Sequence, residues 1–129
     1  MVMKYAYTAV IKEESGTFYV RFPDLDGCIT TGHDLSDAIQ QATDALSAWL
    51  CVAEDEKLDI PMPSGQDDLK REHGEYLAVI SADTLKYRAM TDTRAVRKNV
   101  SLPAWLAKVA DQKRLNCSQI LQEALISML

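Results

Sequence analysis

The chain has 129 residues, of which 47% are hydrophobic and 26% are charged, and its formal net charge is −5. This composition excludes a disordered chain and suits one ordinary domain or two small ones. No apolar run approaches the roughly 18 residues that span a bilayer, and the first residues lack the pattern of a signal peptide. We therefore expect a cytoplasmic protein that has no membrane partner.

The distribution of charge and the cysteines limit the kinds of partner and of site that the sequence allows. Residues 1–88 carry 8 Lys/Arg and 16 Asp/Glu, a balance of −8, whereas residues 89–129 carry 6 and 3, a balance of +3. Acidic and basic partners are thus plausible for different halves of the chain. The three cysteines, Cys28, Cys51 and Cys117, are isolated and form no metal-binding motif, so we expect reduced packing residues, no metal and no cofactor.

The first part of the chain predicts three strands and a helix. Alternating β-forming residues predict a strand at about 3–12, a second at 17–22 that ends at a proline, and a short third at 28–33. Apolar residues then recur at helical spacing, which predicts a helix at about 35–54 with Asp34 as its N-cap.

A polar connector at 54–75 separates this helix from a buried fourth strand at 76–81. The order β-β-β-α-β follows, and it indicates an α+β domain over residues 1–88. The next residues, 84–93, are interpreted as an edge strand that runs into a linker.

Residues 89–129 form a separate pattern. An alternating strand is predicted at 96–102, Pro103 fits the first position of a helix, and Asn116 caps a second helix. A strand and two helices of this length cannot bury a sufficient core alone. Two copies solve this problem if their strands pair into an antiparallel ribbon, so residues 89–129 are predicted to dimerise.

The outer face of that ribbon carries a pattern suited to DNA. Arg97, Asn99 and Ser101 share it, and a two-stranded ribbon fits the major groove, where these residue types bond base edges. We predict that these three residues contact bases. Lys98 is expected to contact phosphate.

The start of the second helix offers a further phosphate site. Asn116, Cys117 and Ser118 would present free backbone N–H groups there. A solvated edge strand is the alternative interpretation of the polar face.

The segment RKNVSLPAWLAKVADQKRLNCSQILQEALISML resembles the ribbon-helix-helix family of DNA-binding proteins. It departs from that family at Lys98, where an apolar residue is common, and at Arg114, where a helix-terminating glycine is common. The resemblance implies base contacts from Arg97, Asn99 and Ser101 and a phosphate clamp at residues 116–118.

The N-terminal part resembles the HicB family through the sequence Phe22-Pro23-Asp24-Leu25-Asp26-Gly27-Cys28. This resemblance implies a partial RNase H-like domain followed by a DNA-binding domain. It also implies a non-enzymatic antitoxin that binds and silences HicA, a small basic RNA-cleaving toxin, and represses its own operon at a palindromic operator. The assembly would be a homodimer, or a tetramer joined through the N-terminal domains.

The residues also allow other interpretations. Asp24 and Asp26 would contact the toxin, or they would only shape a turn together with Gly27. A residual nuclease is disfavoured because the first and fourth predicted strands lack the acids that Mg²⁺ would need. The rival function is a ligand-sensing ribbon-helix-helix repressor without a toxin partner, which would lack a neighbouring gene for a small basic protein.

Overall fold

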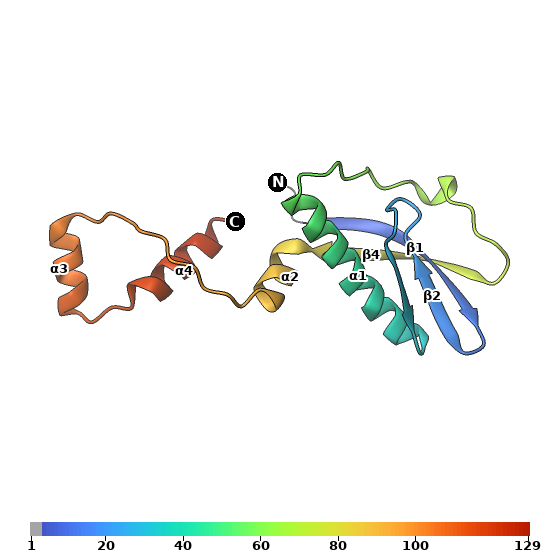
Figure 1. Cartoon of the computed structure of the whole chain (residues 1–129), viewed down its shortest axis with the longest axis horizontal. Coiled ribbons are helices and arrows are strands. Elements are labelled where there is room, and N and C mark those ends of the chain that lie inside the picture. The colour runs from blue at the N-terminus through green and yellow to red at the C-terminus, as the bar shows by residue number, and fades with distance from the viewer. Residues whose placement is uncertain (1–3) are drawn as a thin grey trace. The chain divides into compact units, whose positions relative to one another are not determined.

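The computed structural model describes residues 4–129, which divide into two compact units, one ending at Thr93 and one comprising Arg94–Leu129 (Figure 1). The first unit contains β1 (Lys4–Glu14), β2 (Thr17–Arg21), β3 (Ile29–Gly32), α1 (Leu35–Asp55), the short 3-10 helix η1 (Gln66–Asp68), β4 (Glu75–Asp83) and α2 (Thr84–Thr91). The second contains α3 (Ala104–Gln112) and α4 (Cys117–Ser127).

The four strands form one antiparallel sheet in the order β3-β2-β1-β4, and α1 packs on one of its faces (Figure 1). The predicted order β-β-β-α-β is therefore confirmed for this part of the chain. β1 pairs with β4 from Lys4 to Lys12, but with β2 only from Val10 to Glu14. The N-terminal half of β1 consequently lacks a strand neighbour on its β2 side.

Local chemistry explains the tight turn between β1 and β2. Ser15 and Gly16 both have positive φ angles, 52° and 81°. Two consecutive left-handed residues match the twist of an antiparallel hairpin, and glycine adopts this conformation without a steric cost.

The core lies between the sheet and α1. Its buried members alternate along the strands and recur at helical spacing on α1; they include Tyr7, Ala9, Ile11, Val20, Phe22, Ala38, Ala42, Leu46, Leu50, Ile80 and Ala82. Gly32 lets α1 approach closely, because a Cβ at this position would lie 2.4 Å from the Ala38 nitrogen. Asp34 caps α1 as predicted and accepts a hydrogen bond from the Asp37 N–H at 2.7 Å.

The interpretation of residues 84–93 as an edge strand is wrong, because α2 occupies most of that segment. Asp83 caps α2 by accepting from the Lys86 N–H at 3.2 Å. Arg88 then ties α2 to α1 through Glu54 at 3.1 Å and Asp55 at 2.9 Å. The boundary expected between residues 88 and 89 lies inside this helix.

The second unit has the two predicted helices but no strand. Residues 92–103 form neither helix nor strand, and among the described residues nothing pairs with the predicted strand at 96–102. A strand needs hydrogen-bonding partners, and the single chain supplies none here. Pro103 lies one residue before α3 rather than inside it. Arg114, which stands where a glycine is common, has a φ of 53° at the end of α3.

Candidate functional site

The polar residues predicted to read DNA are open to solvent. Arg97, Lys98, Asn99 and Ser101 are all exposed, and they lie in the irregular segment before α3. Their exposure leaves the side chains accessible to a nucleic acid. Residues 92–103 form neither helix nor strand, so no regular alternation places these side chains on one face.

The start of α4 has the geometry of a capped helix N-terminus. The Asn116 side chain accepts a hydrogen bond from the Gln119 N–H at 3.1 Å, so Asn116 is the predicted N-cap. Cys117 and Ser118 follow it in the first turn and are exposed. The first N–H groups of a helix lack partners within the helix, and the Asn116 side chain satisfies one of them here. The expectation that Cys117 is a packing residue is wrong for the single chain, whereas Cys28 and Cys51 are buried.

The helices of the second unit expose their apolar faces. Ala110 is the one buried residue among residues 94–129. The apolar residues that remain exposed there include Val100, Leu102, Leu106, Val109, Leu115, Ile120 and Leu125. A helical unit with this little burial cannot offset its conformational entropy.

In the first unit, residues 22–28 form a closed loop between β2 and β3. The Phe22 N–H donates to the Cys28 carbonyl at 3.1 Å, and the Cys28 N–H donates to the Leu25 carbonyl at 3.2 Å. Phe22, Leu25 and Cys28 point into the core, and burial raises the pKa of the Cys28 thiol to about 11. Gly27 completes the turn with a φ of 75°.

The two aspartates of this loop have different environments. Asp24 is half-buried, and its carboxylate accepts from both the N–H and the hydroxyl of Ser64 in the connector. Asp26 is exposed, and its backbone carbonyl accepts from the Trp49 indole N–H at 3.0 Å. Asp24 therefore fastens the connector to the loop, while the Asp26 carboxylate is accessible.

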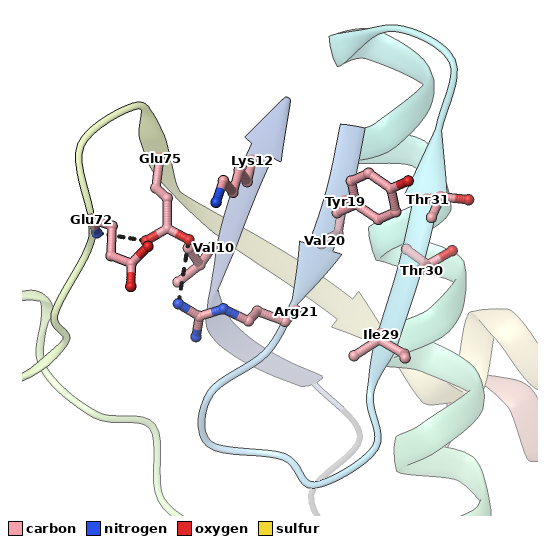
Figure 2. A pocket seen from close by; sticks show the side chains of 10 residues that line it. All are labelled: Val10, Lys12, Tyr19, Val20, Arg21, Ile29, Thr30, Thr31, Glu72 and Glu75. Carbon is pink, nitrogen blue, oxygen red and sulfur yellow. Dashed lines mark hydrogen bonds and ion pairs between the residues drawn. The ribbon is translucent and has the colours of Figure 1, made fainter. Parts of the chain in front are cut away.

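A groove of 570 Å³ lies on the sheet face opposite α1 (Figure 2). Tyr19, Ile29 and Thr31 form one side of it, and Glu75 stands on the other side with Arg21 reaching toward it. The Arg21 guanidinium lies 3.5 Å from the Glu75 carboxylate. Sequence reasoning missed this groove, although the alternation of Tyr19 and Arg21 with buried residues in β2 was a usable signal.

Glu75 is the most buried acidic side chain that lines this groove. Its carboxylate is almost fully buried, and it accepts from the Glu72 N–H at 2.6 Å. That backbone hydrogen bond, followed by the charge of Arg21, holds the pKa of Glu75 below its ordinary value. The carboxylate therefore stays ionised and joins the connector to β2.

A second buried carboxylate lies near the end of α1. Glu54 accepts from the Tyr5 hydroxyl at 2.7 Å, the Thr84 hydroxyl at 3.1 Å and Arg88 at 3.1 Å. Burial and the hydrogen bond to Glu54 raise the pKa of Tyr5 to about 12. This cluster joins β1, α1 and α2.

Across residues 4–129, no group of three or more His, Cys, Asp or Glu side chains is arranged to hold a metal ion. In the same part of the chain, none of the helices has the length and apolar character to cross a membrane.

The fold and these surfaces define a mixed α+β protein with a four-stranded antiparallel sheet and a helical C-terminal unit. A family described as HicB-like antitoxin of bacterial toxin-antitoxin systems matches residues 7–124. The chain therefore belongs to the HicB-like antitoxin family, which confirms the resemblance seen in the sequence.

Individual relatives agree with this assignment. Antitoxin HicB 1 of Photorhabdus laumondii is 40% identical over 67 residues, which cover 50% of this chain and 43% of that protein. A chain from a toxin-antitoxin complex of Streptococcus pneumoniae has a similar fold, with a TM-score of 0.64 and 20% identity over 98% of this chain and all of that one. A chain from the HicA3 and HicB3 toxin-antitoxin complex matches at a TM-score of 0.51 and 25% identity, over 61% of this chain and 99% of that one.

Proposed function

We propose that this protein is the antitoxin of a HicAB-like pair, which binds and silences a HicA-like RNA-cleaving toxin and represses its own operon. The observation that carries the proposal is the family match over residues 7–124. The similarity to a chain from a HicA3 and HicB3 complex supports a toxin as the direct partner.

Toxin binding is assigned to the first unit, which we interpret as a partial RNase H-like domain without enzymatic activity. Residues 1–88 carry a balance of −8, and a basic toxin would be attracted to such a surface. Within the hallmark loop, Asp26 is the better contact residue because its carboxylate is exposed. Asp24 already bonds Ser64, so its contribution to toxin binding would be indirect.

Operator binding is assigned to the second unit, as a ribbon-helix-helix dimer. Its support is the exposed apolar face of residues 94–129, where only Ala110 is buried among the described residues. A second copy would cover that face and supply the missing strand partner for residues 96–102. Arg97, Asn99 and Ser101 would then contact bases, while Lys98 and the start of α4 would contact phosphates.

The groove beside Tyr19 and Arg21 favours one competing function, a ligand-sensing repressor without a toxin partner. A small molecule could occupy 570 Å³, which lies within the usual range of ligand pockets. Membership in an antitoxin family favours the toxin instead.

The test is growth rescue. The small basic protein encoded beside this gene should arrest growth when it is expressed alone, and co-expression of this chain should restore growth. A neighbouring protein that is harmless would overturn the toxin assignment. An arrest that this chain does not relieve would overturn it as well.

A further inference from the structure

The groove on the sheet face opposite α1 has a regular arrangement of side chains that the strand registers set (Figure 2). Lys12 of β1 pairs with Tyr19 of β2, and Val10 of β1 pairs with Arg21 of β2. Arg21 also pairs with Ile29 of β3. Directly opposed residues point to the same face of an antiparallel sheet, so cationic and apolar side chains lie next to one another in this groove.

The apolar side chains suit the body of a small molecule. Val10 is buried at the floor of the groove, whereas Ile29 is 70% exposed and Tyr19 is 48% exposed. An apolar group that covered Ile29 and Tyr19 would remove their surface from water, which is favourable. The volume of 570 Å³ is enough for a drug-sized or smaller molecule.

Arg21 is the cation that the groove offers to a ligand. Among residues 4–129, the one partner of its guanidinium is the buried Glu75 carboxylate, at 3.5 Å. A guanidinium has several N–H donors in one plane, and the Arg21 side chain is 47% exposed, so most of its donors are open. Glu75 therefore holds Arg21 in position and leaves it able to bind a carboxylate.

Glu72 supplies an acid on the connector side of the groove (Figure 2). Its backbone N–H donates to the Glu75 carboxylate at 2.6 Å, and its carbonyl accepts from the Glu75 N–H at 3.1 Å, so the backbone of Glu72 is held in place. The Glu72 carboxylate itself is exposed, and within the described part of the chain it forms no hydrogen bond or ion pair. It is thus available to a ligand cation.

The charges that line the groove balance. The last of them, Lys12, lies 3.4 Å from Glu14 in an exposed pair that water weakens. The charged lining residues are two cations and two acids, Lys12, Arg21, Glu72 and Glu75, which sum to zero. A ligand that carries both charges fits this rim, whereas a simple anion would be repelled by Glu72 and a simple cation by Arg21.

We propose that this groove binds a free α-amino acid with an apolar side chain. Its carboxylate bonds Arg21 and its ammonium group bonds Glu72. Both residues contact the same Glu75 carboxylate, so they lie close enough to serve the two adjacent charges of one amino acid. The apolar side chain of the ligand covers Tyr19 and Ile29.

This site is separate from the antitoxin and repressor surfaces. Neither the aspartates of the loop at residues 22–28 nor any residue of the second unit lines the groove. The inference therefore does not depend on the proposed function, and its test needs neither toxin nor DNA.

The test is isothermal titration calorimetry of the full chain with a series of probes that share an indole ring. L-tryptophan carries both charges, indole-3-acetate only the carboxylate, tryptamine only the ammonium group, and 3-methylindole neither. L-tryptophan should bind about tenfold more tightly than either singly charged probe, because each of these lacks one charge-assisted contact. No saturable binding of L-tryptophan, or equal binding of a singly charged probe, would overturn the proposal.

Amide chemical shifts of the ¹⁵N-labelled chain locate the bound L-tryptophan. The largest shifts should fall at residues 10–12, 19–21 and 29–31. Shifts confined to residues 94–129, where exposed apolar side chains could also hold an indole ring, would overturn the proposal. Both measurements use the unaltered chain, so they do not depend on how a variant folds.

Two variants then assign the contacts. Arg21→Gln should abolish the preference for L-tryptophan over tryptamine but keep the preference over indole-3-acetate, and Glu72→Gln should do the reverse. Lys108→Gln and Glu123→Gln make the same charge changes at exposed positions of α3 and α4, and they should leave every affinity unchanged. If folded Arg21→Gln and Glu72→Gln proteins kept both preferences, these residues would not contact the ligand and the proposal would be wrong.

Discussion

Replacing Glu54 by leucine would test whether its carboxylate joins α2 to the sheet. The side chain is 2% exposed and accepts hydrogen bonds from Tyr5, Thr84 and Arg88. Leucine has a similar volume, so the change removes the charge and leaves little cavity.

The magnitude follows from these contacts. Hydrogen bonds to a charged group contribute about 1.5–3 kcal/mol each, and breaking a buried ion pair costs about 3–5 kcal/mol. Arg88 is 31% exposed and keeps its bonds to Asp55 and the Cys51 carbonyl, which reduces the loss. We therefore expect Glu54→Leu to lower the free energy of unfolding by about 3 kcal/mol.

The assay is urea unfolding followed by far-ultraviolet circular dichroism. Asp55→Ala is the matched control, because it removes the other acid that Arg88 contacts from a site that is 63% exposed. An exposed ion pair contributes at most about 1 kcal/mol, so this control should unfold near the wild-type midpoint. If Glu54→Leu unfolded within about 1 kcal/mol of the wild type, the carboxylate would not hold α2 in place.

Three further results are expected. Arg97→Ala should weaken operator binding by about 1–3 kcal/mol per lost contact, measured by fluorescence anisotropy. Lys98→Ala should instead weaken binding to operator and scrambled duplexes alike and reduce the salt dependence of binding. If both variants lost their preference for the operator equally, the distinction between a base contact and a phosphate contact would be refuted. Asp24→Ala should lower the free energy of unfolding by about 1–3 kcal/mol, measured by urea unfolding. Asp26→Ala should leave that free energy unchanged but weaken toxin binding. The roles given to the two aspartates would be contradicted if Asp26→Ala destabilised the fold and Asp24→Ala weakened only toxin binding. The pKa of Glu75 lies below its ordinary value of 4.5, so its carboxylate stabilises the fold above that pH, and this stabilisation is lost as the pH falls through the lowered pKa. Glu75→Gln should therefore lose less stability than the wild type does on acidification. An equal loss of stability in the two proteins would argue against this role of Glu75.

The elements that the sequence predicts well are those whose periodicity is local. The alternation in β1 and β2 and the helical spacing in α1 depend on neighbouring residues, and their predicted bounds differ from the structure by only a few residues. The N-caps Asp34 and Asn116 were predictable for the same reason, since a cap is read from three or four consecutive residues.

The features that sequence reasoning missed depend on contacts between distant residues. α2 is held by Arg88 and Glu54, which are 34 positions apart, and no local pattern reports that bond. The groove on the sheet face opposite α1 similarly brings residues of β2 and β3 together with Glu75, which begins β4 after the long connector. The ribbon at residues 96–102 stays a prediction, because its partner strand would come from another chain.

The central claim is that this chain silences the toxin encoded beside it, and an inhibition assay with purified proteins tests it most directly. The small basic protein encoded beside this gene would be incubated with RNA, alone and with increasing amounts of this chain, and cleavage would be followed on a gel. The account predicts that the toxin cleaves RNA and that this chain abolishes cleavage once the two are equimolar. Cleavage that continues undiminished in the presence of excess folded chain would contradict it.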